Sequence, residues 1–373
     1  MPRVSTRSGM RPVSAIFSIV VIAAALTQPA RGQATSFPTD SAILAMLRAR
    51  LERSGSTAIV VGLLEDGKRR VIAQGTTSRG GQVVDGNTVF EIGSITKVFT
   101  GTLLADMARR GEIRLEDPVG KYLPASVRMP SSNGRKITVG DLADQHSGLP
   151  RLPDNLNPAN PRNPYADYPA DSMFAFLSRH TLARVPGARF EYSNLGVGLL
   201  GHALARRAET SYESLLIERI LDPLGLDDTR ITLTPSMRQR LAAGHDASGA
   251  PAENWDIPSL AGAGALRSTA NDLLDFAAAA LGAPGPLAAA FEMAQRPRHD
   301  INPRMSIGLN WFTARAGNVA IVWHNGGTGG YRSYLGLDKG GRRAVVVLTN
   351  SQSGADDIGR HLLDPILPLA SAP

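Results

Sequence analysis

Apolar and polar positions follow different periods at the start of the chain. Residues 38–54 carry apolar side chains at helical spacing. Two strand-like runs follow, Ala58–Leu64 and Arg70–Gln74, and Asp66-Gly67 between them is typical of a tight hairpin turn. The pattern therefore predicts a helix and then a β-hairpin.

The middle of the chain is dominated by helical spacing and the last third by strand-like runs. A long segment rich in Pro, Asn and Asp, residues 152–170, interrupts the middle and is typical of a functional lid or rim. The predicted helices are 94–110, one opening at Thr138-x-x-Asp141, a punctuated series over 171–224, one opening at Thr269-x-x-Asp272, and 355–366. The predicted strands are Ser306–Phe312, Asn318–Trp323, Tyr331–Asp338 and Arg343–Thr349.

Strands thus open and close the chain, with helices between them. This order predicts an α/β (α+β) fold with one antiparallel β-sheet of about five strands, flanked by helices, and an inserted all-helical domain. The expected α/β part comprises residues 35–110 and 285–368 of a domain spanning 35–368. The expected helical part covers about 111–284.

The first 34 residues have the layout of an export signal. Three arginines precede the apolar run Ala15–Leu26, and small residues follow it. The run is short for a membrane span, which needs about 20 residues. We therefore predict a signal peptide over 1–34, an exported protein in the periplasm or outside the cell, and no stable membrane anchor, with an uncleaved anchor as the alternative.

The charge and the aromatic content of the chain argue against nucleic-acid binding. The net charge of +7 includes four arginines of the predicted signal and no acidic residue there, which leaves +3 for the rest. Without a basic cluster and with 5% aromatic residues, the chain is not expected to bind nucleic acid. Only five of the 40 basic residues are Lys, so a Lys in a motif draws attention, because ammonium can lose a proton where guanidinium cannot.

Metal and cofactor chemistry is not expected. The chain has no Cys, which excludes disulfides, thiol catalysis and Cys-ligated metals. Apart from His324, which belongs to a motif described below, its His residues, including His146, lack metal-ligand spacing, and structural roles are predicted for them. The prediction is therefore no metal and no cofactor.

The first chemical motif is Ser94-Ile95-Thr96-Lys97. Residues three apart on a helix share a face, so Lys97 would lie one turn from the Ser94 hydroxyl. The helix start favours developing negative charge, and a neighbouring Lys activates a hydroxyl nucleophile. Taken alone, such a motif is more often a helix cap with a solvated Lys.

Two later motifs carry complementary groups. Tyr192-Ser193-Asn194 offers a phenol, whose pKa neighbouring cations would lower so that it serves as a base, and an amide that can bond to substrate. His324-Asn325-Gly326-Gly327 follows an apolar run, so it is expected at or just after a strand end, where glycines let a substrate approach the backbone. Alone, these motifs also fit a turn into a helix and a hairpin turn.

Together the three motifs resemble the signature of the serine β-lactamase and penicillin-binding-protein superfamily: Ser-x-x-Lys, Tyr-x-Asn and Lys/His-x-Gly, in that order. The resemblance extends over about residues 38–368. It includes the segments Gln145–Pro150 and Gly262–Asp272, which are similar to the family's HTSGLP and GGLxSTAxD stretches. The Tyr192 motif and the context FEIGSITK favour the class C branch, which holds AmpC-like β-lactamases, AmpH-like peptidases and esterases.

The resemblance implies roles for individual residues. Ser94 is expected to be the acylated nucleophile, with Lys97 and Tyr192 sharing the task of general base; which of them takes the proton is left open. Asn194 would orient that base, and the amides of Ser94 and Gly327, with Gly326 beside them, would form the oxyanion hole. His324 stands where most β-lactamases carry Lys.

Departures from the pattern bear on the substrate. His324 is expected to be only partly charged near neutral pH, which weakens the case for an efficient β-lactamase and favours peptidases or esterases. Leu152 stands where class C β-lactamases place an amide-recognising Gln. The predicted substrates are β-lactams or D-Ala-D-Ala-type amides, small or peptidoglycan-derived. The alternatives are a carboxylesterase of this fold and a penicillin-binding sensor without turnover, and the oligomeric state is left open.

Overall fold

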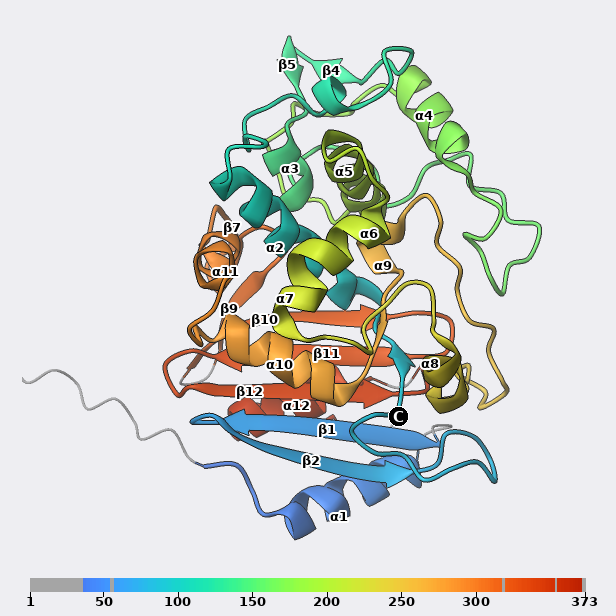
Figure 1. The fold of residues 1–373 in the computed structure, drawn as a ribbon, viewed down its shortest axis with the longest axis vertical. Coiled ribbons are helices and arrows are strands. Elements are labelled where there is room, and N and C mark those ends of the chain that lie inside the picture. The colour runs from blue at the N-terminus through green and yellow to red at the C-terminus, as the bar shows by residue number, and fades with distance from the viewer. Residues whose placement is uncertain (1–35, 54–56, 317–318, 353, 371–373) are drawn as a thin grey trace, which may run out of the picture. The chain divides into compact units, whose positions relative to one another are not determined.

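Strands from both ends of the chain pair in one antiparallel sheet (Figure 1). The computed structural model describes residues 36–53, 57–316, 319–352 and 354–370. Within these residues the sheet has eight strands in the order β2-β1-β12-β11-β10-β9-β8-β7. Their bounds are β1 Ala58–Glu65, β2 Lys68–Gly75, β7 His299–Asn302, β8 Met305–Ile307, β9 Phe312–Ala316, β10 Val319–Gly327, β11 Arg332–Asp338 and β12 Arg343–Thr349.

The prediction of about five strands was too low. The run Ser306–Phe312 does not form one strand: residues 308–311 make a turn between β8 and β9, in which Asn310 has φ +61°. The short edge strand β7 also carries the polar sequence HDIN, which gives no strand-like alternation. The antiparallel architecture with flanking helices is confirmed.

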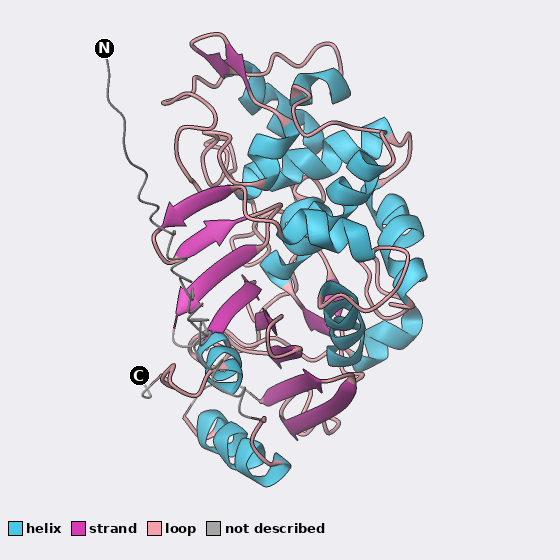
Figure 2. Cartoon of the chain, turned by 90° about the vertical axis from the view of Figure 1, so that its left-hand side faces the viewer, coloured by secondary structure: helices cyan, strands magenta, loops and turns pink. Residues whose placement is uncertain are grey.

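Both faces of the sheet are covered, so its central strands are almost entirely apolar. On β1, Ile59, Val61 and Leu63 belong to the apolar cluster that includes α1 and α12. The alternate residues Val60 and Leu64 belong to the larger cluster under the other helices. Seen at 90° to the first view, most helices gather on one side of the sheet (Figure 2).

The helices begin where the capping residues predict. Thr138 and Asp141 form a reciprocal capping box, and Thr269 accepts a bond from the backbone N–H of Asp272. The helical segments are α1 Asp40–Leu51, η1 Gly93–Ile95, α2 Thr96–Arg109, η2 Val119–Tyr122, α3 Val139–Ala143, α4 Ala170–Arg179, α5 Asn194–Arg207, α6 Tyr212–Leu216, η3 Ile217–Leu221, α7 Asp222–Leu224, α8 Pro235–Arg240, α9 Ala261–Gly264, α10 Ala270–Ala280, α11 Ala288–Gln295 and α12 Asp356–Leu363. Two short antiparallel pairs complete the fold: β3 Phe90–Glu91 with the distant β6 Arg267–Ser268, and the hairpin of β4 Ser131–Ser132 with β5 Arg135–Lys136.

Strand β10 extends further than its apolar run indicates. His324–Gly327 lie inside the strand, paired with Arg332–Leu335 of β11, and not beyond its end. The segment η1 packs closely against this end of β10. Gly326 and Gly327 have no side chains that would oppose this packing, so the strand can continue to Gly327.

Two predictions are not tested by the described residues. The signal peptide over 1–34 lies outside them, and the division of 35–368 into an α/β part and a helical part stays a prediction. No helix within the described ranges is long and apolar enough to cross a membrane.

Candidate active site

Ser94 lies in a tight helical turn that leads into α2. The turn is η1, and it begins at Gly93 with φ +48°, a backbone conformation that favours glycine. A Cβ on Gly93 would lie 2.6 Å from the backbone N of Gly327 on β10. The start of the helix and the third motif are therefore in direct backbone contact.

Lys97 is fully buried, and its ammonium group bonds to three acceptors. Nζ donates to Ser94 Oγ at 3.0 Å, to Asn194 Oδ1 at 2.8 Å and to the carbonyl of Ala263 at 2.6 Å. Burial, helped by the charge of Arg151, lowers the pKa of Lys97 well below its usual value. A buried Lys with a lowered pKa can take a proton from a hydroxyl at lower pH than a solvated one.

Tyr192 is the second donor to the nucleophile. Its phenol donates to Ser94 Oγ at 2.8 Å. Lys97 Nζ and Arg151 Cζ lie 4.9 and 5.0 Å from the ring centre. The expectation that these cations lower the phenol pKa was wrong: burial raises it to about 12, since desolvation of the phenolate outweighs the Ser94 hydrogen bond and the charge of Arg151.

The loop that carries Tyr192 ends in a helix cap. The Ser193 hydroxyl accepts from Gly196 N at 2.8 Å and donates to the carbonyl of Pro150 at 2.6 Å. This cap starts α5 at Asn194, whose side chain then reaches Lys97. Residues of the second motif thus meet both residues of the first.

His324 lies behind Tyr192, with ring centres 6.4 Å apart. It is 1% exposed, and burial, together with the nearby Lys97, lowers its pKa to about 3. The expectation of partial charge near neutral pH is therefore wrong, because the imidazolium would have to form in an apolar surrounding. Its Nδ1 lies 2.6 Å from the carbonyl of Asn325, and the imidazole lines neither of the two pockets at Ser94.

Gly326 and Gly327 of β10 allow close backbone packing, and Gly327 also leaves room for a substrate at Ser94. A Cβ on Gly326 would lie 2.0 Å from the carbonyl oxygen of Ile92, so this position accepts no side chain. Gly327 lines both pockets at Ser94. The predicted oxyanion-hole roles of Gly326 and Gly327 stay predictions, and their position beside Ser94 meets the spatial requirement for them.

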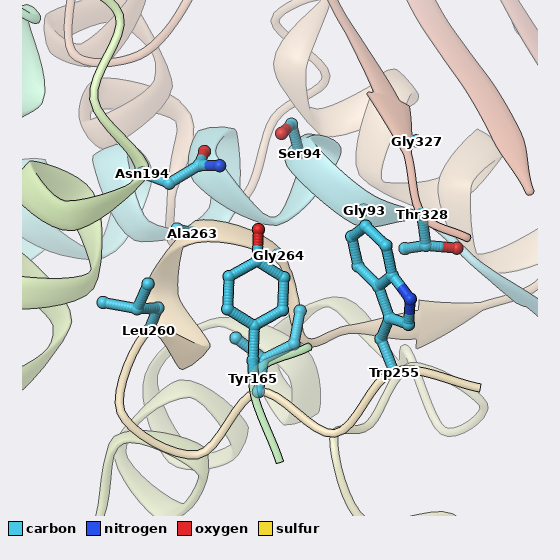
Figure 3. Close-up of a pocket in the computed structure, with 11 residues that line it drawn as sticks. Gly93, Ser94, Tyr165, Asn194, Trp255, Leu260, Ala263, Gly264, Gly327 and Thr328 are labelled. Atoms are coloured by element: carbon cyan, nitrogen blue, oxygen red, sulfur yellow. The ribbon is translucent and has the colours of Figure 1, made fainter. Parts of the chain in front are cut away.

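Ser94 lines two pockets. One is narrow, with about 30 Å³ of free space, and Tyr165, Trp255 and Leu260 help to form its walls. Figure 3 shows Ser94 and Asn194 on one side of it and the rings of Tyr165 and Trp255 on the other. The second is open, about 500 Å³, and includes Arg151 and Arg332. The site therefore offers a narrow pocket and a wide pocket, and the wide one carries two guanidinium groups.

Sequence reasoning did not single out four of these wall residues: Arg151, Tyr165, Trp255 and Arg332. Tyr165 comes from the long loop 152–170 that was expected to form a rim. Arg151 directly follows the GLP segment, so the side chain facing the pocket is one position before Leu152, which packs against the core. Trp255 and Arg332 stand in no recognised motif, and only the fold brings them to Ser94.

Asp144, His146 and His299 form a cluster that lines neither pocket at Ser94. A carboxylate oxygen of Asp144 and one ring nitrogen of each His lie within 4.8 Å of one another. Asp144 also accepts from Arg298 Nε at 3.1 Å, and the two imidazoles are stacked with centres 4.0 Å apart. Because Arg298 already balances the carboxylate and stacked rings converge poorly on one ion, the geometry favours a hydrogen-bonded ionic cluster. The absence of a metal remains a prediction.

A serine, a lysine and a tyrosine that share one hydroxyl, in a cleft beside an antiparallel sheet, define a serine hydrolase of the β-lactamase and penicillin-binding-protein type. The "Beta-lactamase" family model matches residues 43–364, and the chain belongs to this family. It is 29% identical over 357 residues to the D-alanyl-D-alanine-carboxypeptidase/endopeptidase AmpH of Escherichia coli strain K12, covering 91% of each chain.

Solved structures place the fold in the class C branch. A class C β-lactamase from Rhodobacter sphaeroides superposes with a TM-score of 0.75 and 25% identity, covering 88% of this chain and 98% of that one. The D-alanine carboxypeptidase AmpC from Burkholderia cenocepacia has a TM-score of 0.74 and 23% identity, covering 87% and 98%. The fold and superfamily inferred from three short motifs are confirmed.

Proposed function

We propose that this chain is an exported serine hydrolase that forms an acyl-enzyme at Ser94 with amides that carry a carboxylate, such as β-lactams and D-Ala-D-Ala-type peptides. The observation that carries the proposal is the Ser94 hydroxyl, which accepts from both Lys97 Nζ and Tyr192 Oη. A hydroxyl between a lysine of lowered pKa and a phenol has a proton acceptor on one side and a proton donor on the other.

In the proposed reaction Ser94 Oγ attacks the carbonyl carbon while its proton passes to Lys97, either directly or through Tyr192, whose phenol takes the Ser94 proton as it gives its own to Lys97. The tetrahedral oxyanion would face the Ser94 and Gly327 amides, and the amine leaves after accepting a proton from the same pair. Water then attacks the ester carbonyl and gives a proton to the same pair, the pair returns this proton to the leaving Ser94 Oγ, and the acid is released with the Ser94 hydroxyl restored. The AmpH and AmpC relatives are named for D-alanine carboxypeptidase activity, which supports an amide substrate.

The two arginines of the wide pocket support an anionic substrate. No carboxylate lies within 4.0 Å of the Arg151 or Arg332 guanidinium in the described part of the chain. Arg332 is half-buried, its pKa is lowered by burial, and it bonds to the carbonyls of Thr328 and Tyr331 beside Gly327. Since His324 is neutral, these guanidinium groups are the cations of the pocket that can hold a carboxylate.

A substrate panel tests the proposal. We expect the chain to hydrolyse nitrocefin or a D-Ala-D-Ala peptide together with p-nitrophenyl acetate, and Ser94→Ala to abolish all of these activities. Intact-protein mass spectrometry should show a transient adduct that Ser94→Ala lacks. Substantial turnover by Ser94→Ala would overturn the mechanism, and a permanent penicillin adduct would favour the sensor.

The charge of the substrate distinguishes the proposed peptidase from the esterase alternative. Arg332→Gln should raise KM for a D-Ala-D-Ala peptide about 10- to 100-fold, as expected for the loss of a hydrogen bond to a charged group. The same peptide with a C-terminal amide should be affected little. Equal effects on both peptides, or activity on neutral esters alone, would favour the esterase.

The compartment in which the protein is recovered tests the proposed export. We expect the full chain to be recovered outside the inner membrane in a form shortened near residue 34, and a chain lacking residues 1–34 to stay in the cytoplasm. A full-length product that remains with the membrane would favour an uncleaved anchor.

A further inference from the structure

Two buried amide side chains near the catalytic loop stand on strained backbone. Gln145 has φ +64° and is 1% exposed, and Asn310 has φ +61° and is fully buried. Residues other than glycine adopt this conformation at a cost, and they retain it only where surrounding contacts hold them. Gln145 follows α3, and Asn310 lies in the turn between β8 and β9.

The two strained residues are bonded to each other. Gln145 Nε2 donates to Asn310 Oδ1 at 2.9 Å, and Asn310 N donates to the carbonyl of Ala143 at 2.7 Å. The orientation of the Gln145 amide follows from its other partner: Ser193 N–H donates to it, so its oxygen must face Ser193 and its NH₂ must face Asn310. The pair thus ties the segment after α3 to the sheet.

Gln145 holds the catalytic loop on both sides of Tyr192. Its backbone carbonyl accepts from Glu191 N at 2.8 Å, and its side-chain oxygen accepts from Ser193 N at 2.7 Å. Ser193 is the N-cap of α5, and α5 begins at Asn194. One residue therefore fixes the backbone from which both the phenol and the amide reach the Ser94–Lys97 pair.

The neighbours of Gln145 keep its strained conformation in place. Asp144 accepts from Arg298 Nε, while His146 Nδ1 lies 2.7 Å from the Asp144 carbonyl. The carbonyl of His146 accepts from Gly187 N at 2.7 Å. Contacts on each side thus leave Gln145 little freedom to relax, which is the condition under which strain persists.

We propose that Gln145 and Asn310 are positioning residues that set Tyr192 and Asn194 against Ser94. Asn310 anchors the Gln145 amide to the sheet, and Gln145 transmits that position to the loop through two backbone hydrogen bonds. The inference rests on the proposed function of Ser94 as the acylated nucleophile. Displacements of about 1 Å in reacting groups cost up to about 100-fold in rate, so a loosened loop should slow acylation.

Three variants test this. Gln145→Met removes both side-chain bonds at similar length. Asn310→Gly removes the acceptor and relieves the strain at φ +61°, so it spares the fold. Gln295→Met is the matched control, because Gln295 is an equally buried amide with two bonds, to the Ala280 carbonyl and from Lys339 Nζ.

The measurement is the burst of p-nitrophenyl acetate hydrolysis, with the acylation rate constant taken per acylatable site so that unfolded protein does not contribute. We expect Gln145→Met and Asn310→Gly to slow acylation about 10- to 100-fold and Gln295→Met to stay within about twofold of the wild type. The double variant Gln145→Met/Asn310→Gly should acylate only slightly more slowly than Gln145→Met alone, because both changes remove the same Gln145–Asn310 hydrogen bond.

The inference would be overturned if Gln145→Met and Asn310→Gly acylated as fast as the Gln295→Met control. It would also be overturned if these variants had a lower melting temperature but an unchanged acylation rate constant. If Gln145→Met does not fold, Asn310→Gly decides. A wild type without a Ser94-dependent burst would instead refute the proposed function, so the two failures are distinguishable.

Discussion

Ser94 Oγ receives hydrogen bonds from two groups, and burial shifts their pKa values in opposite directions. Burial lowers the pKa of Lys97, because it disfavours the cation, and raises that of Tyr192, because it disfavours the anion. Both shifts therefore favour uncharged side chains around the nucleophile. A neutral lysine is a base, and a neutral phenol is a donor, so this pair divides the work of moving the Ser94 proton.

We expect kcat/KM for an ester to rise with pH as Lys97 loses its proton, and Tyr192→Phe to keep that rising limb. The reason is that Tyr192 stays protonated up to about pH 12 and cannot titrate at lower pH. The variant should lose about 10²- to 10⁴-fold in kcat, as for removal of a positioned acid–base group. If the limb disappears with the phenol, Tyr192 is the base.

His324 should not titrate in the neutral range, because its pKa lies near 3. We expect His324→Gln to leave the shape of the kcat/KM profile between about pH 5 and 8 unchanged, whatever its effect on the absolute rate. A transition near pH 6.5 in the wild type that the variant lacks would contradict the burial argument.

At the scale of elements, the site depends on how closely η1 approaches β10. Gly93 has φ +48° and its Cα faces the backbone of Gly327, while Gly326 packs against Ile92. Glycines on both sides let the nucleophile's turn contact the strand through backbone atoms alone. This contact places the amide of Gly327 beside Ser94.

We expect Gly93→Ala to lower the free energy of unfolding by about 1–3 kcal/mol and to reduce kcat/KM at least 10-fold, because the new Cβ would push β10 away. Gly67→Ala is the control: its φ is +78°, and nothing lies within 4 Å of a Cβ there. Urea unfolding should show a larger loss of stability for Gly93→Ala than for Gly67→Ala, which carries the backbone cost alone, and ester hydrolysis should show a loss of activity for Gly93→Ala only. Equal activities would contradict the packing argument.

At the scale of the whole molecule, residues far apart in sequence share buried polar groups. Asp272, at the start of α10, accepts from Thr229 Oγ at 2.7 Å and from Asp228 N at 3.0 Å. Burial, the largest influence, raises its pKa from 3.8 to about 6. The folded state therefore binds more protons at Asp272 than the unfolded state does between these values.

Because the folded pKa is the higher one, the contribution of Asp272 to stability is fully present below about pH 4 and is lost as pH rises through about 6. We expect the free energy of unfolding of Asp272→Asn, relative to wild type, to rise between pH 4 and pH 7. Urea unfolding of both proteins at the two pH values measures this, and the comparison cancels other titrating groups. A constant difference would show that Asp272 does not titrate there.

The sequence by itself determined the elements with strong periodicity, the capped starts of α3 and α10, and the identity of Ser94, Lys97 and Tyr192 as a chemical set. The elements and helix starts follow from local spacing, and the chemical set follows from the resemblance of three motifs to the signature of the superfamily. The sequence could not determine the break at Asn310, whose backbone is held by the distant carbonyl of Ala143, or the edge strand β7, whose polar sequence HDIN shows no strand-like alternation.

The tertiary structure alone decided the charge states and the walls of the site. A pKa depends on burial, so the neutral His324 and the raised pKa of Tyr192 appear only when the helices cover them. Arg332, Trp255 and Asn310 stand in no local pattern that marks them for this site, and the bond between Gln145 and Asn310 joins a recognised segment to an unmarked one. They reach Ser94 or its loop because β10, β11 and the segments between helices come together in space, which spacing along a chain does not record.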